Sequence, residues 1–180
     1  MLQWYPVCSF CGSSSVQWSK TYFDCLDCHK RNFVNASTAA WCYLYDDQWR
    51  ILLVQVAREP RKGTYKDAWW FADVDLDDSL EWTVQREVKE ELSIDLIREK
   101  LHYLCSRLEV YRYQERDVPV MVALFVYPLP EDQKSLIICN DDVASYLRVN
   151  PETFDPSIMA TPQHADAVRK AFDFVKNILS

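Results

Sequence analysis

Residues 85–94 read QREVKEELSI and place one arginine and three glutamates within about two to three helical turns. Glu87, Glu90 and Glu91 are separated only by Val88 and Lys89. Acidic runs of this kind are typical of the solvated face of a helix, but oxygen-rich clusters are also what a hard cation requires. The arrangement of the apolar residues around the run distinguishes the two interpretations.

Apolar residues recur through this segment at helical spacing and predict a helix over about 79–92. At about 100° per residue they form one stripe, roughly 120° wide, that faces the core. The stripe consists of Leu80, Val84, Val88 and Leu92. The three glutamates share an arc of about 100°, and Glu91 lies inside the edge of the stripe. A solvated face would lie opposite the stripe.

Clustered carboxylates beside a buried stripe repel one another and resist desolvation, so they require compensating positive charge. Arg86 can supply part of it, four residues before Glu90. Mg²⁺ or Mn²⁺, which prefer oxygen ligands, would supply the rest. The helix alone leaves a plain Glu-rich surface as the alternative.

The stretch is part of a longer pattern, which runs from Ala72 to Ile94 as ADVDLDDSLEWTVQREVKEELSI. This order resembles the Nudix box: Gly, five residues, Glu, seven residues, then Arg-Glu-apolar-x-Glu-Glu-x-Gly-apolar. The Arg-Glu-x-x-Glu-Glu core matches, whereas Asp78 replaces a glutamate, and Ala72 and Ser93 replace the two glycines. The resemblance extends over roughly residues 39–180.

The resemblance implies an α/β fold, a Nudix-type α/β/α sandwich with a mixed sheet. It implies that Glu87, Glu90 and Glu91 hold catalytic Mg²⁺ or Mn²⁺ and that Arg86 orients them. Such metals neutralise a diphosphate and activate water for attack on phosphorus. The implied activity is metal-dependent hydrolysis of the diphosphate linkage in a nucleoside diphosphate derivative, such as a nucleotide sugar or dinucleotide.

The same resemblance suggests further site residues. Ala72 keeps the carbonyl that the first box glycine lends to a metal, and Asp78 is either a helix cap or a metal ligand. Ser79 is the other candidate cap. Tyr111, 17 residues after the box, stands where diadenosine-polyphosphate hydrolases tend to carry a tyrosine that contacts substrate. The family takes its general base either from the box or from a distant loop, where Glu115, Asp142 and Glu152 are the candidates.

The rest of the larger domain reads as strands with one more helix. We expect two β-hairpins, 39–45 with 49–57 and 101–113 with 118–129, and further strands near 69–74 and over 143–149. A final helix begins at Pro162, after Thr161 as its cap, and carries apolar residues at helical spacing. Residues 58–67 and 130–142 read as loops.

Four of the seven cysteines form two close pairs, Cys8-x-x-Cys11 and Cys25-x-x-Cys28, separated by 13 residues. This spacing is typical of a zinc ribbon, in which four thiolates hold structural Zn²⁺ in a tetrahedron. A unit of 37 residues has too few apolar residues for a core of its own, so it requires such a metal. We therefore predict a zinc ribbon over 1–37 ahead of a Nudix-like hydrolase domain over 38–180.

The remaining cysteines and histidines have structural interpretations. His29 follows Cys28 and should be exposed, because four cysteines already fill the coordination sphere. The free thiols Cys42, Cys105 and Cys139 lie in apolar or strand-like runs, where burial is expected.

Composition limits the partners of the protein. The net charge of -7 disfavours binding to nucleic acid, because a polyanion is held mainly by clustered Lys and Arg. No run approaches the roughly 18 apolar residues of a membrane span, and the first residues lack a signal-peptide pattern, which predicts a cytoplasmic protein without a membrane partner. The expected partner is a small nucleotide substrate, and pairing into a homodimer remains open.

Two other functions compete with hydrolysis. Because Ala72, Asp78 and Ser93 depart from the box, the domain could be a catalytically weak or inactive nucleotide sensor. The ribbon could instead be an adaptor for protein or nucleic acid, with the larger domain as its scaffold. The intact glutamates favour the enzyme, since a pure binder has no obvious reason to keep clustered acids.

Overall fold

The computed structural model describes residues 7–19, 22–33, 37–57, 65–66, 79–113, 116–140 and 143–179. The chain separates into two compact units, Met1–Ser37 and Thr38–Ser180. Among the described helices, none has the length and apolar character needed to cross a bilayer.

The first unit is a small antiparallel sheet of three strands in the order β1-β2-β3. The strands are β1 (Val16–Trp18), β2 (Tyr22–Cys25) and β3 (Arg31–Phe33). Its buried residues, within the part that the structure describes, are Cys8, Phe23, Cys25 and Asn32. So small an apolar core cannot by itself offset the chain entropy lost on folding.

Within the described residues, the second unit is built on a six-stranded sheet with the path β6-β5-β4-β8-β7, and β9 also pairs with β5, antiparallel to it. Leu129 N donates to Tyr45 O where β4 and β8 both end, so these two strands run in the same direction and the sheet is mixed. The strands are β4 (Ser37–Tyr45), β5 (Ile51–Val56), β6 (Tyr65–Lys66), β7 (His102–Tyr113), β8 (Arg116–Pro128) and β9 (Val143–Val149).

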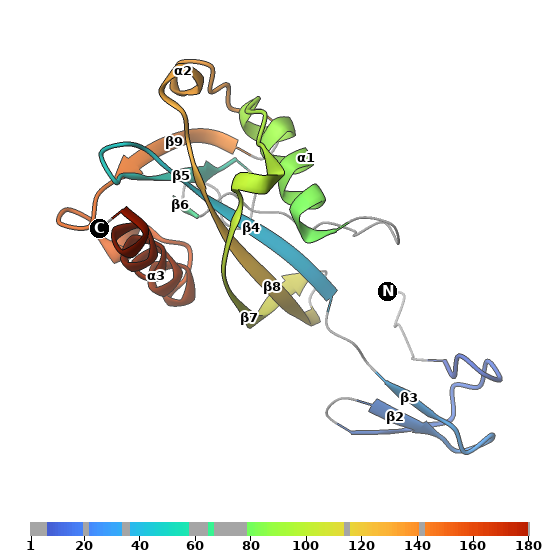
Figure 1. The fold of residues 1–180 in the computed structure, drawn as a ribbon. Helices are drawn as coiled ribbons and strands as arrows, with labels where there is room; N and C mark the ends of the chain where they lie inside the picture. Colours follow the sequence, from blue (N-terminus) through green and yellow to red (C-terminus); the bar gives the residue numbers. More distant parts are fainter. Residues whose placement is uncertain are drawn as a thin grey trace. The chain divides into compact units, whose positions relative to one another are not determined.

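Helices cover both faces of this sheet, as Figure 1 shows for α1 (Leu80–Leu92) and α3 (Pro162–Leu179). Alternation along β4 divides the core, because successive side chains point to opposite faces. Trp41 and Tyr43 pack on the α3 side, and Cys42 and Leu44 pack on the α1 side. The predicted α/β/α sandwich is confirmed.

Most of the predicted elements are present. Both hairpins form, β9 covers the predicted 143–149, and α3 begins at Pro162 with the Thr161 hydroxyl accepting from His164 N. Of the apolar residues expected at helical spacing in α3, Ala165, Val168, Phe172 and Val175 are buried, and the side chain of Leu179 lies outside those described.

Three predictions about loops were wrong. Tyr65–Lys66, within the predicted loop 58–67, forms β6 because its backbone pairs with Val54 and Gln55 of β5. Residues 131–134, within the predicted loop 130–142, form the short helix α2 (Glu131–Lys134). Strand β8 begins at Arg116, two residues inside the expected polar turn. The predicted strand near 69–74 lies outside the described residues.

The turn between β4 and β5 is held by one buried carboxylate. Asp46 Oδ1 accepts from the backbone N–H groups of Gln48 and Arg50, each at 3.0 Å, and Asp46 Oδ2 accepts from Arg50 Nε at 2.8 Å. Trp49 adopts φ +65°, a left-handed conformation that is unfavourable for a bulky residue. The hydrogen bonds to Asp46 offset that strain.

Candidate functional site

Helix α1 buries two of the three predicted carboxylates, Glu87 and Glu91, on the side that faces the sheet. Val84, Val88 and Leu92 are fully buried there and form the apolar stripe. Glu91 has 0% exposure and Glu87 is also buried. The interpretation of these two acids as part of the buried edge, and not of a solvated face, is confirmed.

Glu90 differs from its two neighbours because its side chain is exposed. Helical spacing places all three acids in one arc of α1, but only Glu87 and Glu91 are buried against the domain. Arg86, between Gln85 and Glu87, donates from Nη2 to Glu87 Oε1 at 2.7 Å. The expected compensating charge therefore acts on Glu87.

These side chains fit a hard divalent cation. Glu87 and Glu91 are four residues apart, so they lie on the same face of α1 and about one turn apart. Both offer carboxylate oxygens withdrawn from water, and oxygen is the donor that Mg²⁺ and Mn²⁺ prefer.

Ser93, which replaces the second box glycine, ends α1 in the backbone conformation that glycine favours. Its φ is +59°, and its N–H donates to Lys89 O. The side chain of Asn140 donates to Ser93 Oγ at 3.1 Å, and the Asn140 N–H donates to Glu91 O at 2.8 Å. This replacement keeps the helix end intact, because a distant segment supplies partners for the last turn.

At the other end of α1, Ser79 is the N-cap and accepts from Trp82 N at 3.2 Å. Of the two cap candidates, Ser79 is the one that the structure describes in this role. Glu81 is two residues after the cap, so the capping-box spacing counted from Asp78 does not apply.

The structure describes only some of the remaining predicted site residues. Ala72, Asp78, Glu115 and Asp142 lie outside the described residues. Tyr111 belongs to β7, where its backbone is opposite Val118, and its side chain is not among those described. Glu152 is exposed in the turn after β9.

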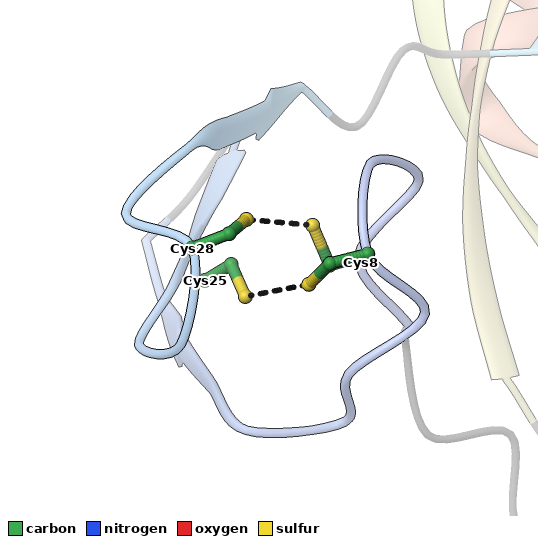
Figure 2. Close-up of side chains that lie close together, drawn as sticks. Cys8, Cys25 and Cys28 are labelled. Carbon is green, nitrogen blue, oxygen red and sulfur yellow. Dashed lines mark hydrogen bonds between the residues drawn. The ribbon is translucent and has the colours of Figure 1, made fainter.

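The four paired cysteines converge in the first unit, with all their sulfur atoms within 4.8 Å of one another. Cys8 Sγ lies 3.5 Å from Cys28 Sγ, and Cys11 Sγ lies 3.6 Å from Cys25 Sγ (Figure 2). A tetrahedral zinc site with Zn–S bonds of about 2.3 Å requires sulfur separations of about 3.8 Å. The thiolate set fits Zn²⁺.

Two similar turns bring the cysteines together. Gly12 N donates to Cys8 O and His29 N donates to Cys25 O, and both donors follow the second cysteine of their pair. Gly12 has φ +74° and His29 has φ +57°, so both turns need a left-handed residue at this point. His29 is exposed, as predicted.

The surroundings of Cys8 favour its thiolate. Burial opposes ionisation, but hydrogen bonds from the Phe10 N–H and the Asn32 amide outweigh burial and lower the pKa of Cys8 to about 6. The Asn32 amide oxygen also accepts from the Ser9 N–H at 2.9 Å. Asn32 thus links β3 to the first cysteine pair, a role that the spacing of the cysteines did not reveal.

The other thiols are only partly as expected. Cys42 is buried and its pKa is raised by burial, whereas Cys105 and Cys139 are half-buried. The pKa of Cys139 is raised by burial and then by the negative charge of Glu91. Segment 138–140 therefore lies beside the acidic helix, and no pattern in the sequence predicted this contact.

The larger domain is an α/β/α sandwich with an Arg-Glu-x-x-Glu-Glu helix packed against the sheet, which is the arrangement that the resemblance to the Nudix box implies. Residues 36–171 match the family profile described as NUDIX domain. The chain therefore belongs to the Nudix family. No curated protein matches its sequence.

Solved structures share the fold at low sequence identity. A MutT/nudix family protein from Enterococcus faecalis has a TM-score of 0.64 at 18% identity, with 81% of this chain and 64% of that chain covered. The NUDIX domain of Shewanella oneidensis NrtR, complexed with ADP ribose, gives 0.62 at 18%, with 79% and 90% covered.

A third similar structure is a bifunctional NMN adenylyltransferase/ADP ribose pyrophosphatase from Francisella tularensis, complexed with AMP and a manganese ion. It gives a TM-score of 0.57 at 21% identity, with 77% of this chain and 42% of that chain covered. The present chain therefore spans less than two thirds of the length of the Enterococcus and Francisella proteins. These similarities concern the fold alone.

Proposed function

We propose that the chain is a metal-dependent pyrophosphohydrolase that cleaves the diphosphate linkage of a nucleoside diphosphate derivative. The observation that carries the proposal is the pair of buried carboxylates, Glu87 and Glu91, on the box helix of a Nudix domain. Buried acids lower the stability of a domain, so their presence here favours a functional role such as metal binding.

Each residue has a distinct task in this proposal. Glu87 and Glu91 provide the covered oxygen ligands for Mg²⁺ or Mn²⁺, and Glu90 provides the ligand nearest to solvent. Arg86 holds the Glu87 carboxylate in one orientation through its ion pair. A bound divalent metal would supply charge neutralisation at the diphosphate and a more acidic water. Ala72, Asp78 and Tyr111 are proposed to contribute to metal and substrate binding.

The substrate class is supported by the similar structures. One was solved with ADP ribose, and another is described as an ADP ribose pyrophosphatase and holds AMP with manganese. These ligands contain or derive from an adenosine diphosphate unit. We therefore propose dinucleotides and nucleotide sugars as the first substrates to test.

The test is a panel of nucleoside diphosphate derivatives with Mg²⁺ or Mn²⁺, followed by chromatographic analysis of the products. Glu90→Gln should lower kcat/KM by about 100-fold or more, because it removes a charged ligand but is too exposed to disturb folding. Glu99→Gln is the matched control, since Glu99 is exposed on the one-turn helix Arg98–Lys100. Turnover that survives Glu90→Gln unchanged would exclude the proposed site.

A nucleotide sensor is the second candidate, and the changed residues of the box loop, Ala72 and Asp78, favour it. Saturable binding of a substrate with no turnover under any metal condition would support the sensor over the enzyme. Isothermal titration calorimetry on the wild-type protein, with and without Mg²⁺, separates binding from hydrolysis.

For the first unit we propose a structural zinc ribbon over residues 1–37, followed by the hydrolase domain over 38–180. The convergence of four sulfur atoms supports this assignment. The adaptor alternative requires a partner to bind the ribbon. Pull-down with the intact chain and with Trp18→Ala, an exposed ribbon residue, tests it.

A further inference from the structure

A polar pocket lies at the end of the larger sheet that carries the turn between β4 and β5. Its volume is about 540 Å³, within the range of small-molecule sites. Its lining comes from three separate parts of the chain: the turn, α2 with the residue after it, and β9. These residues are Asp47, Gln48, Arg50, Glu131, Lys134, Ser135, Tyr146 and Arg148.

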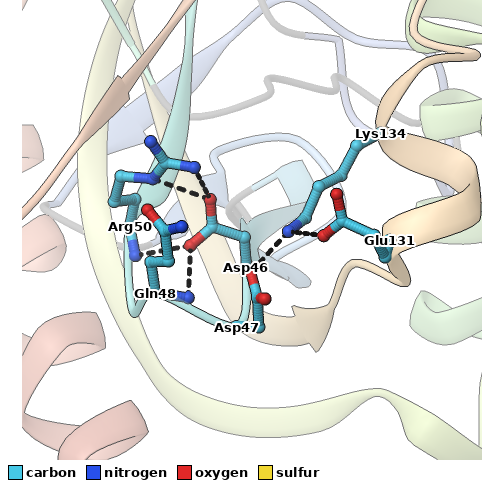
Figure 3. A network of polar contacts seen from close by, with 6 residues as sticks. All are labelled: Asp46, Asp47, Gln48, Arg50, Glu131 and Lys134. Atoms are coloured by element: carbon cyan, nitrogen blue, oxygen red, sulfur yellow. Dashed lines mark hydrogen bonds and ion pairs between the residues drawn. The ribbon is translucent and has the colours of Figure 1, made fainter.

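Two of the three cations in this pocket already have partners. Arg50 pairs with the buried Asp46 at 2.8 Å. Lys134 pairs with Asp47 at 2.5 Å and also with Glu131, so it joins α2 to the turn (Figure 3). The Lys134 side chain is only 9% exposed, whereas both of its carboxylate partners are at the solvent-facing rim. Lys134 is thus a fixed cation in the pocket wall.

Arg148 is the third cation and differs from the other two. Its guanidinium lies over the Tyr146 ring at 5.7 Å, which orients it, but among the described residues it has no ion pair. Its Nε is buried and has no hydrogen-bond partner within the same described part of the chain. A buried donor without a partner is costly to stability, and a water or ligand that supplies the missing acceptor would remove that cost.

We propose that this pocket binds a small phosphomonoester, with Arg148 as the principal contact to its phosphate. The guanidinium fork matches two phosphate oxygens, and its ring support keeps it in one orientation. Lys134 lies in the same wall, but its charge is balanced by Asp47 and Glu131, so Arg148 is the cation left for the phosphate.

The pocket is distinct from the acidic surface of α1, since none of its lining residues belongs to that helix. The two are nevertheless connected through the chain that follows α2. Ile138 N donates to Leu92 O, and Asn140 N donates to Glu91 O. A ligand that orders α2 would therefore act on the segment that supports the last turn of α1. The binding site itself does not depend on the proposed hydrolysis.

Binding is tested by calorimetry and by ¹H–¹⁵N NMR titration of the full chain without divalent metal ions. The chelator used must leave zinc bound, which elemental analysis checks. The probes are inorganic phosphate, AMP and glucose 6-phosphate, and adenosine is the uncharged control. We expect saturable binding of at least one phosphate-bearing probe, no binding of adenosine, and shift changes confined to residues 46–50, 131–135 and 146–148. Equal affinity for inorganic phosphate and for both esters would show that the pocket recognises the phosphate group alone. Higher affinity for AMP or for glucose 6-phosphate would show that the pocket also contacts the nucleoside or the sugar.

Arg148→Gln should weaken that binding about tenfold or more, because it removes charge-assisted hydrogen bonds. Arg98→Gln is the matched control, since Arg98 lies over the Trp82 ring at 5.3 Å but outside the pocket. It should bind as the wild type does. Absence of saturable binding to the wild type, or shift changes centred on α1, would overturn the proposal. The wild-type NMR map decides the outcome even if Arg148→Gln fails to fold.

Discussion

Replacement of Asp46 by alanine should destabilise the larger domain by about 3–4 kcal/mol. The side chain is only 2% exposed, and it accepts two backbone hydrogen bonds and an ion pair with Arg50. Hydrogen bonds to a charged group contribute about 1.5–3 kcal/mol each, but they share one carboxylate and do not add fully. Arg50 retains partial hydration, because its side chain is 31% exposed.

Asp46→Asn separates the two contributions. An amide oxygen still accepts from the Gln48 and Arg50 N–H groups, whereas the charge that holds the guanidinium is lost. The expected loss is about 1.5–2 kcal/mol, roughly half that of alanine. Alanine is expected to cost more than asparagine because it also removes the two backbone hydrogen bonds. These bonds hold the turn in which Trp49 adopts its unfavourable left-handed conformation.

The control is Asp95→Ala. Asp95 forms an ion pair of similar length with Lys89, at 2.6 Å, but its side chain is 76% exposed. Such surface pairs contribute about 0–1 kcal/mol. Differential scanning calorimetry should show a fall in Tm of about 10 °C for Asp46→Ala and about 2 °C or less for Asp95→Ala. Equal falls for the two variants would refute the reasoning that burial of the carboxylate sets its value.

Three further predictions concern other parts of the chain. Elemental analysis should find about one zinc per chain, and Cys25→Ser should abolish both the bound zinc and the NMR chemical-shift dispersion of residues 7–33 while the larger domain stays folded. Well-dispersed signals from these residues in a protein without zinc would contradict the metal site. Ser93→Gly should stabilise the protein by at most about 1 kcal/mol, because relief of backbone strain at φ +59° is offset by loss of the Asn140 hydrogen bond. Ser93→Val should destabilise it by about 1–2 kcal/mol in urea unfolding, and equal stabilities for the two variants would count against backbone strain at this position. Lys134 lowers the pKa of Asp47, so the ion pair is fully formed at pH values above the ordinary aspartate pKa and is lost as pH falls through the folded-state pKa. An NMR pH titration should give a midpoint below about 3.9 for Asp47, and Lys134→Gln should return the midpoint to about that value.

The sequence predicted features that depend on neighbours along the chain. The burial of Glu91 followed from its place among Leu80, Val84 and Val88, because helical spacing alone sets which residues share a face. The convergence of the four thiols followed from two Cys-x-x-Cys pairs for a similar reason, since each short turn aims both thiols at one point. The two hairpins and α3 were likewise visible as local patterns.

The tertiary structure determined which distant groups meet. Lys134 and Asp47 are 87 residues apart, and Asn140 and Ser93 are 47 apart. Their contacts depend on how α2 and the chain after it pack at the end of the sheet, which no periodicity encodes. The same packing made β6 from a predicted loop, left Glu90 exposed, and placed Arg148 in a pocket. The sequence by itself thus determined the family and the acidic helix, while long-range packing determined how that helix ends and what lies beside it.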